Sequence, residues 1–283
     1  MTKRTAGNDP HEFSGKVVVI TGAGSGIGRS TALLFGRLGA KVHVADVDSA
    51  SAERAQRDIE AGGGSAVAHA VDVSDPTAVE ELATRVYEQE DGVDVLHNNA
   101  GIGHGGDTVS TTVEDWQRVI GINLLGVAYG VQAFVPRMLA QGRPATIVNT
   151  ASAAGLVPAA RMAPYCASKF GVVGMTEALN AELAPQGIHL SAICPGIINT
   201  PIVGTAIARG EFAARQQKAV EFYAKRGASP DQVAEAVVDA VRKRKLIQTV
   251  PKSHVVPTWL LHRVSARATQ PLSRIMMRAA IGR

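Results

Sequence analysis

The chain has 283 residues, a net charge of +4, 29 glycines and two cysteines. This length suits one large α/β domain, and two cysteines exclude a disulfide framework. Residues 1–13 are polar and lack the apolar centre of a signal peptide, so we expect a disordered tail and a cytoplasmic protein. No run of about 18 apolar residues occurs, which predicts that no helix spans a membrane.

A strand, a glycine-rich turn and a helix open the folded part. Residues 16–20 are an apolar, β-branched run typical of a buried strand, and a helical pattern closes at Gly39. Glycines in the turn between them would let an anion approach the backbone N–H groups and the positive end of the helix dipole. The glycines could mark a turn with no ligand, but their position between a strand and a helix favours a dinucleotide site. Its candidate residues are Gly22, Ser25, Gly26, Ile27 and Gly28.

The second predicted strand, residues 41–45, ends at Asp46, which stands 18 residues after Gly28. A carboxylate at about this distance suits the ribose hydroxyls of the adenosine and would repel a 2′-phosphate. No Arg or Lys adjoins Asp46, and Ser25 occupies the turn position where a base could hold that phosphate. We therefore favour NAD over NADP. Asp46 could also cap the next helix, a role compatible with the first.

The middle of the chain continues the alternation. Helical patterns at 49–61 and 76–90 flank a strand at 66–71, and another strand follows at 93–97. Asp72 and Val73 follow one strand, and Asn98, Asn99, Ala100 and Gly101 follow the next, so both groups should meet at the carboxyl edge of the sheet. Residues 112–138 read as one long helix with Asn123 on a mostly apolar surface. Asn123 is either a structural link or part of a site.

Tyr165 and Lys169 form the strongest candidate pair, and Ser152 stands thirteen residues before Tyr165. Ser152 follows a predicted strand at 145–150, and Tyr165 and Lys169 lie one turn apart at the start of a helix that runs to about 185. The pKa of a free tyrosine is about 10, and a nearby ammonium group favours the phenolate. Tyr165 could then exchange a proton with an alcohol or a carbonyl near neutral pH. A tyrosine and a lysine at this spacing are, taken alone, an ordinary helix pair.

The last third of the domain repeats the pattern. A strand at 188–194 ends at Pro195 and Gly196, residues 201–227 resemble a mobile lid built from two short helices, and a helix at 229–243 precedes a strand at 246–250. Strand and helix signals alternate seven times. This predicts a Rossmann-like, doubly wound α/β fold: a seven-stranded parallel sheet with helices on both faces, over residues 14–250.

Together these motifs resemble the short-chain dehydrogenase/reductase family over roughly residues 14–250. The T-G-x-x-x-G-x-G turn at 21–28, the N-N-A-G run at 98–101, Asn123, Ser152, the Y-x-x-x-K motif at 165–169 and Pro195-Gly196 occur in order and at the right spacing. The resemblance implies that Tyr165 is the acid/base, that Ser152 orients the reacting oxygen, and that Lys169 lowers the pKa of Tyr165 and binds the nicotinamide ribose. Asn123 would hold a water that links Lys169 to solvent.

The resemblance also assigns the cofactor contacts and an assembly. Asp72 and Val73 would contact the adenine, residues 98–101 would line the cofactor, and Ile198 and Thr200 would hold the carboxamide. Helices 112–138 and 164–184 look like the pair that forms the family's homodimers and homotetramers. The implied reaction moves hydride between a carbinol carbon and nicotinamide, and needs no metal. Two alternatives stay open: an NADP-dependent carbonyl reductase, and a dinucleotide-sensing or scaffold protein without turnover.

The expected substrate is a hydrophobic secondary alcohol or ketone, because the candidate pocket residues are apolar: Ile102, Leu156, Val157, Met162, Ile197, Ile202 and Val203. We interpret His104 as a loop residue. Arg161 and Arg209 are the candidates for holding a carboxylate substrate.

The tail after about residue 251 lies outside the family pattern. The last acidic residue is Asp239, and ten basic residues follow it. Apolar residues at helical spacing make residues 251–283 a basic amphipathic extension, packed on this or a neighbouring subunit. Peripheral contact with an anionic membrane is the alternative. No nucleic-acid-reading module is recognised.

Overall fold

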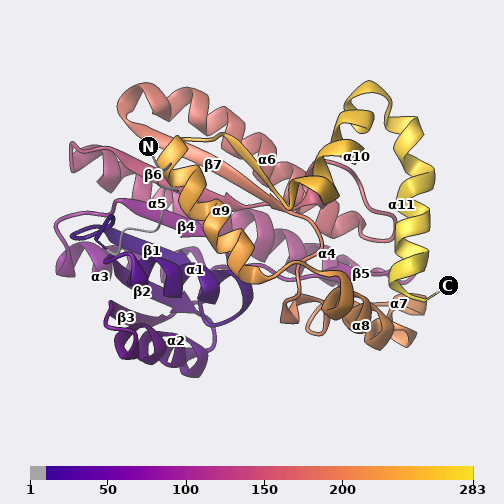
Figure 1. Cartoon of the computed structure of the whole chain (residues 1–283), viewed down its shortest axis with the longest axis horizontal. Helices are drawn as coiled ribbons and strands as arrows, with labels where there is room; N and C mark the ends of the chain where they lie inside the picture. Colours follow the sequence, from indigo (N-terminus) through magenta and orange to yellow (C-terminus); the bar gives the residue numbers. More distant parts are fainter. Residues whose placement is uncertain (1–10, 283) are drawn as a thin grey trace, which may run out of the picture.

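The computed structural model describes residues 11–282. Seven parallel strands form the central sheet in the order β3-β2-β1-β4-β6-β7-β9, which confirms the predicted doubly wound fold (Figure 1). Their bounds are β1 Val17–Thr21, β2 Lys41–Asp46, β3 Ser65–Ala70, β4 Val95–Asn98, β6 Ala145–Thr150, β7 Ile188–Pro195 and β9 Ile247–Val250. The strand order reverses between β1 and β4, so the crevice at their carboxyl ends is where this fold binds ligands.

Helices cover both faces because the apolar, β-branched strands are buried on both sides. The helices that connect the strands are α1 Gly26–Arg37, α2 Ser49–Ala61, α3 Pro76–Gln89, α4 Val113–Ile120, α5 Gly126–Ala140, α6 Ala163–Leu183 and α9 Pro230–Lys243. Residues from α1, α2 and α9 share one core cluster with the sheet. Residues from α3 and α5 pack in a second cluster with the sheet.

The predicted long helix at 112–138 is continuous but not uniform. Residues Gly121–Leu125 are wound as a π-helix between α4 and α5. This helical stretch, Val113–Ala140, is long and apolar enough to cross a membrane, which the sequence interpretation missed. However, Val127, Phe134 and Met138 are buried in the core clusters, as expected of a core helix.

The predicted lid contains the two short helices that were expected. It also contains a short strand that was not predicted. Here α7 spans Gly210–Ala214 and α8 spans Gln216–Arg226, while β8 (Ile207–Ala208) pairs with β5 (His104–Gly105) in a separate two-stranded sheet. Residue 104 therefore lies in a strand rather than a loop. This pairing ties the lid to the segment after β4.

Both ends of the described part of the chain, residues 11–282, pack on the domain. Residues 1–10 of the predicted disordered tail lie outside the described residues, but Phe13 is buried with its ring edge on Phe35, 5.0 Å between centroids. The tail prediction therefore does not hold for residues 11–13. At the other end, α10 (Lys252–Val264) and α11 (Ala266–Ala280) project at one end of the molecule, with α11 reaching α7 and α8 (Figure 1).

Candidate active site

The glycine turn between β1 and α1 has no room for side chains at two positions. Gly22 has φ +62°, and a Cβ on it would lie 2.7 Å from Ala100 Cα. A Cβ on Gly28 would lie 2.2 Å from the Gly22 carbonyl oxygen. Ser25, just before α1, makes no side-chain capping bond. The first N–H groups of α1 are therefore available to an anion, which fits the diphosphate of a dinucleotide.

Asp46 ends β2 beside this turn. Its Oδ2 accepts a hydrogen bond from Gly24 N at 2.8 Å, and its Oδ1 accepts one from Asp48 N at 3.1 Å. Asp72 and Val73 follow β3 and, like Asp46, line the same cavity. The carboxylate thus stabilises the turn and also presents a negative charge at the edge where the adenosine ribose is expected.

Asn98 does not line the cavity, contrary to the prediction. It is 2% exposed, and its Nδ2 donates to Asn149 Oδ1 at 3.0 Å inside the sheet. Successive side chains of a strand face opposite sides, so Asn99 is the residue that turns towards the glycine turn. Its Nδ2 donates to the carbonyl oxygens of Thr21 and Gly22 at 3.0 and 3.1 Å.

The sequence interpretation missed Thr21 and gave Asn99 no role of its own. The Thr21 hydroxyl oxygen accepts from the backbone N–H groups of Asn99 and Ala100 at 3.0 and 3.1 Å. Strand β1 and the segment after β4 are therefore held together at the glycine turn. The adjacent asparagines were visible in the sequence, but the pairing of Thr21 with them depends on the strand order.

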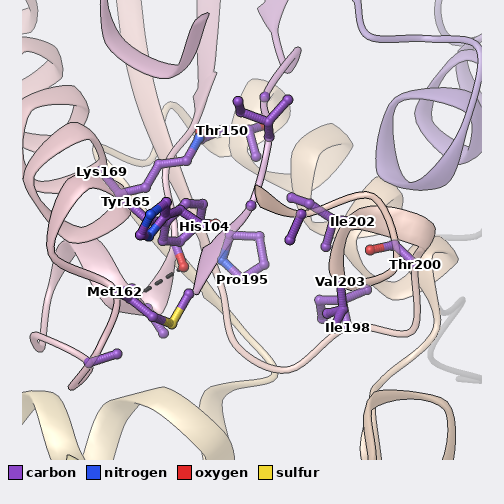
Figure 2. Close-up of a pocket in the computed structure, with 18 of the residues that line it drawn as sticks. His104, Thr150, Met162, Tyr165, Lys169, Pro195, Ile198, Thr200, Ile202 and Val203 are labelled. Atoms are coloured by element: carbon purple, nitrogen blue, oxygen red, sulfur yellow. Dashed lines mark hydrogen bonds between the residues drawn. The ribbon is translucent and has the colours of Figure 1, made fainter. Parts of the chain in front are cut away.

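Ser152, Tyr165 and Lys169 converge below the carboxyl end of β6. Tyr165 is the third residue of α6, and its phenol is hydrogen-bonded to Ser152. Lys169, one turn further on, donates from Nζ to the Thr150 carbonyl oxygen at 2.8 Å. Its Nζ lies 5.8 Å from the centroid of the Tyr165 ring. Figure 2 shows Tyr165, Lys169, His104 and Met162 on one side of the view and Ile198, Thr200 and Ile202 on the other.

The pKa values of this group differ from the expectation. Burial raises the pKa of Tyr165 to about 12, and the hydrogen bond with Ser152 only partly opposes it. Burial also lowers the pKa of Lys169 to about 8. Lys169 is not among the groups that shift the pKa of Tyr165 in the protein alone. The expected lowering is therefore not met there, because desolvation of the phenolate dominates. In this state Tyr165 is a neutral phenol, able to donate a proton.

Asn123 is fully buried in the π-helical segment. Its Oδ1 accepts from Ile102 N at 2.8 Å, and its Nδ2 donates to Ile102 O at 3.0 Å and to Ser168 Oγ at 3.3 Å. Asn123 does not line the cavity. It holds the segment after Gly101 against α6, and single-turn π-helices of this kind are frequent at functional sites.

One large cavity collects most of the predicted site. Its volume is about 1430 Å³, above the roughly 300–1,000 Å³ typical of a single small-molecule pocket. This volume leaves room for a cofactor and a substrate together. The predicted site residues that line it are Gly22, Ser25, Gly26, Ile27, Asp46, Asp72, Val73, Ala100, Gly101, Ser152, Tyr165, Lys169, Pro195, Gly196, Ile198 and Thr200. Gly28, Asn98 and Asn123 do not.

The predicted apolar pocket residues also line this cavity, except Leu156, which is buried in the core. The two arginines proposed for a carboxylate are engaged elsewhere. Arg161 pairs with Glu211 at 2.5 Å, and Arg209 binds both oxygens of Asp115 at 2.8 Å. Neither of them lines the cavity. His104 does, and burial lowers its pKa, so it is neutral at pH 7.

The C-terminal extension forms part of the same cavity wall. Residues of α10 and α11, among them Val255, Leu272 and Met276, line the cavity together with Phe222 and Tyr223 of α8. The extension therefore packs on its own domain, as the first of the two interpretations expected. A catalytic domain that ends at residue 250 would leave out these two helices of the cavity wall.

Comparisons with known proteins agree with this geometry. Residues 16–210 match the family described as short chain dehydrogenase. The chain is 38% identical over 270 residues to "Probable oxidoreductase EphD" of Mycobacterium tuberculosis (strain ATCC 25618 / H37Rv), an alignment that covers 93% of this chain and 45% of that protein. The chain thus spans about half the length of this curated relative.

Two further matches extend over nearly whole proteins. "Cyclohexanol dehydrogenase" of Acinetobacter sp. (strain SE19) is 37% identical over 228 residues, 80% of this chain and 88% of that one. A crystal structure of a short chain dehydrogenase/reductase from Burkholderia phymatum in complex with NAD is 34% identical, with a TM-score of 0.85 over 91% of this chain and 96% of that chain. The chain belongs to the short-chain dehydrogenase/reductase family of oxidoreductases.

Proposed function

We propose that this protein is an NAD(H)-dependent oxidoreductase that interconverts hydrophobic secondary alcohols and ketones. The observation that carries the proposal is that one cavity joins the glycine turn and Asp46 to Ser152, Tyr165 and Lys169. Its substrate end is lined mainly by apolar side chains, including Ile102, Met162 and Ile202. The two arginines considered for a carboxylate substrate, Arg161 and Arg209, are paired with acids and do not line the cavity.

The residues present fit the cofactor. The glycine turn and the open N-terminus of α1 would hold its diphosphate, Asp46 its adenosine ribose, and Lys169 its nicotinamide ribose. When bound, the nicotinamide supplies hydride chemistry and, in its oxidised form, a positive charge that favours the Tyr165 phenolate. NAD is preferred to NADP because the Asp46 carboxylate would repel a 2′-phosphate.

The protein's own groups handle the proton. Tyr165 donates its hydroxyl proton to the carbonyl oxygen during reduction and takes it back during oxidation. Ser152, hydrogen-bonded to Tyr165, orients the same oxygen. The buried Lys169 ammonium stabilises negative charge that develops on Tyr165 and the substrate oxygen. Asn123 keeps the wall around Lys169 in place through its hydrogen bonds with Ile102 and Ser168. We also propose that Asn123 holds a water that relays protons from Lys169 to solvent. The solvent isotope effect on turnover, compared between the wild type and Asn123→Ala, tests that role.

A screen of secondary alcohols with NAD and with NADP, followed by the absorbance of the reduced cofactor, tests this proposal. We expect turnover of apolar cyclic or linear alcohols with NAD. Turnover with NADP alone would support the carbonyl-reductase alternative. Cofactor binding with no turnover of any alcohol or ketone would support the sensing or scaffold alternative.

Self-association through α4, α5 and α6 is the second part of the proposal. Large apolar side chains of this helical layer are exposed in the single chain, among them Trp116 at 39%, Leu125 at 41% and Phe170 at 38%. Burial of such side chains in a homodimer or homotetramer would be favourable. Light scattering after size-exclusion chromatography measures the assembly. Phe170→Glu should shift it towards the monomer, and an unchanged mass would contradict this interface.

Peripheral membrane contact through α10 and α11 is the other proposal for the tail. Leu260 and Val264 of α10 are 56% and 86% exposed, and Arg263 and Arg267 lie beside them in the chain, so an anionic bilayer would match both features. The full-length protein should sediment with anionic vesicles, and deletion of residues 252–283 should abolish this binding. Neutral vesicles should bind neither the full-length protein nor the truncated one. Equal binding of both forms to anionic vesicles would contradict the proposal. The cytoplasmic location stays a prediction.

A further inference from the structure

The outer end of the cavity has apolar walls from two helices that the family match at residues 16–210 does not include. We call this part the outer compartment; it is lined by Phe222 and Tyr223 of α8 and by Leu272, Ile275 and Met276 of α11. Among the described residues, α8 and α11 contribute no acidic side chain to the lining, and Arg226 is the one basic residue that they contribute. An apolar ligand suits such walls.

Helix α11 is fixed in this position at its middle and at its C-terminal end. Ser273 Oγ accepts a hydrogen bond from Ala160 N at 2.6 Å, which ties α11 to the segment just before α6. At its end, Arg215 donates to the carbonyl oxygens of Ile281 and Gly282 at 3.3 and 3.1 Å. Ile281 is 1% exposed. Helix α11 is therefore held in place by contacts with the rest of the domain.

The outer compartment is continuous with the reacting end. Met162, three residues before Tyr165, packs against the cluster that contains Phe212 of α7 and Met277 of α11. Met162 and Tyr165 line the same cavity as Leu272 and Met276. A substrate whose oxygen lies at Tyr165 could therefore extend past Met162 to reach α8 and α11.

The side chains of α11 that line the cavity are incompletely covered. Leu272 is 39% exposed and Met276 is 51% exposed, and their spacing of four puts them on one face of the helix. Both side chains line the cavity, so part of their exposed surface faces it. An apolar group that enters the cavity would bury them.

We propose that the outer compartment binds an extended apolar chain attached to the substrate's reacting carbon, with α11 as the element that determines specificity. This rests on the proposed function and narrows its substrate class to alcohols and ketones that carry a long alkyl chain. Burial of each additional methylene should strengthen binding about fourfold until the compartment is filled.

Calorimetric titration of a series from 2-butanone to 2-dodecanone into the protein saturated with oxidised cofactor tests the proposal. A ketone cannot be reduced by oxidised cofactor, so the dissociation constants are measured without turnover. For the wild type we expect Kd to fall about fourfold for each methylene over part of the series. Leu272→Ser should weaken binding of the long ketones by about tenfold or more and leave 2-butanone unchanged.

The matched control is Leu260→Ser, because Leu260 is a half-exposed leucine of the same tail that does not line the cavity. It should reproduce the wild-type series. Met276→Ser is the second variant and should resemble Leu272→Ser. A wild-type Kd that does not depend on chain length, or equal effects of Leu272→Ser and Leu260→Ser, would overturn the proposal. If binding depends on chain length but the matching alcohols are not turned over, the proposed function is refuted. The proposal that the outer compartment binds an apolar chain would still hold.

Discussion

Gly28→Ala tests whether the glycine turn is as tightly packed as the structure indicates. The new Cβ would lie 2.2 Å from the Gly22 carbonyl oxygen and 2.5 Å from Asn99 Nδ2. Neither neighbour moves freely, because Asn99 Nδ2 donates to the carbonyl oxygens of Thr21 and Gly22. The turn must therefore shift, at a cost of about 1–3 kcal/mol in the free energy of unfolding. The melting temperature should fall by roughly 2–10 °C.

The same shift displaces the backbone N–H groups that would hold the diphosphate. We expect the dissociation constant of NADH, measured by fluorescence titration, to rise by about tenfold or more, since a loss of about 1.4 kcal/mol suffices. Thermal unfolding followed by circular dichroism gives the stability of the same sample.

Gly174→Ala is the control, because it makes the same chemical change in the exposed face of α6, where a Cβ would meet nothing within 4 Å. There alanine should stabilise the helix by about 0.5–1 kcal/mol and leave NADH binding unchanged. If Gly28→Ala binds NADH as tightly as Gly174→Ala does, the turn is not the dinucleotide site and this reasoning is refuted.

Two further predictions concern charge. Asp46→Asn keeps an acceptor for Gly24 N but removes the negative charge that would repel the 2′-phosphate of NADP. The ratio of kcat/KM for NADP to kcat/KM for NAD should therefore rise by about fivefold or more. An unchanged ratio would show that Asp46 does not select the cofactor. Burial, with the neighbouring charge of His43, lowers the pKa of His69 from 6.5 to about 4. The unfolded chain therefore takes up a proton first, and the free energy of unfolding should decrease as the pH falls from about 6.5 to 4. His69→Gln should flatten that decrease in urea titrations, and an unaltered pH dependence would contradict the assignment.

The fold could be predicted because each strand of the central sheet, and each helix that connects those strands, has a local signal. The apolar runs at 17–20 and 145–150 and the glycines at 22–28 specify strands and a turn without reference to distant residues. The order of these signals then leaves few topologies for a parallel sheet. Ser152 and Tyr165 could be placed together through the resemblance to a known family.

The features that were missed depend on contacts between distant parts of the chain. Asn98 faces the interior because of its register with Asn149 in β6, and Arg209 is withdrawn from the cavity by Asp115, 94 residues earlier. The pKa of Tyr165 follows from burial, which spacing along a helix does not reveal. The contribution of α11 to the cavity depends on Ser273 meeting Ala160, a contact that no local pattern signals.

Tyr165→Phe, measured for both turnover and cofactor binding, tests the central claim most directly. The phenylalanine ring keeps the shape of the buried side chain and removes only the hydroxyl that meets Ser152 and the reacting oxygen. We predict that kcat falls by about 10²–10⁴-fold, while the dissociation constant of NADH stays within about twofold of the wild-type value. Retention of most of the turnover would contradict the assignment of Tyr165 as the group that exchanges a proton with the substrate.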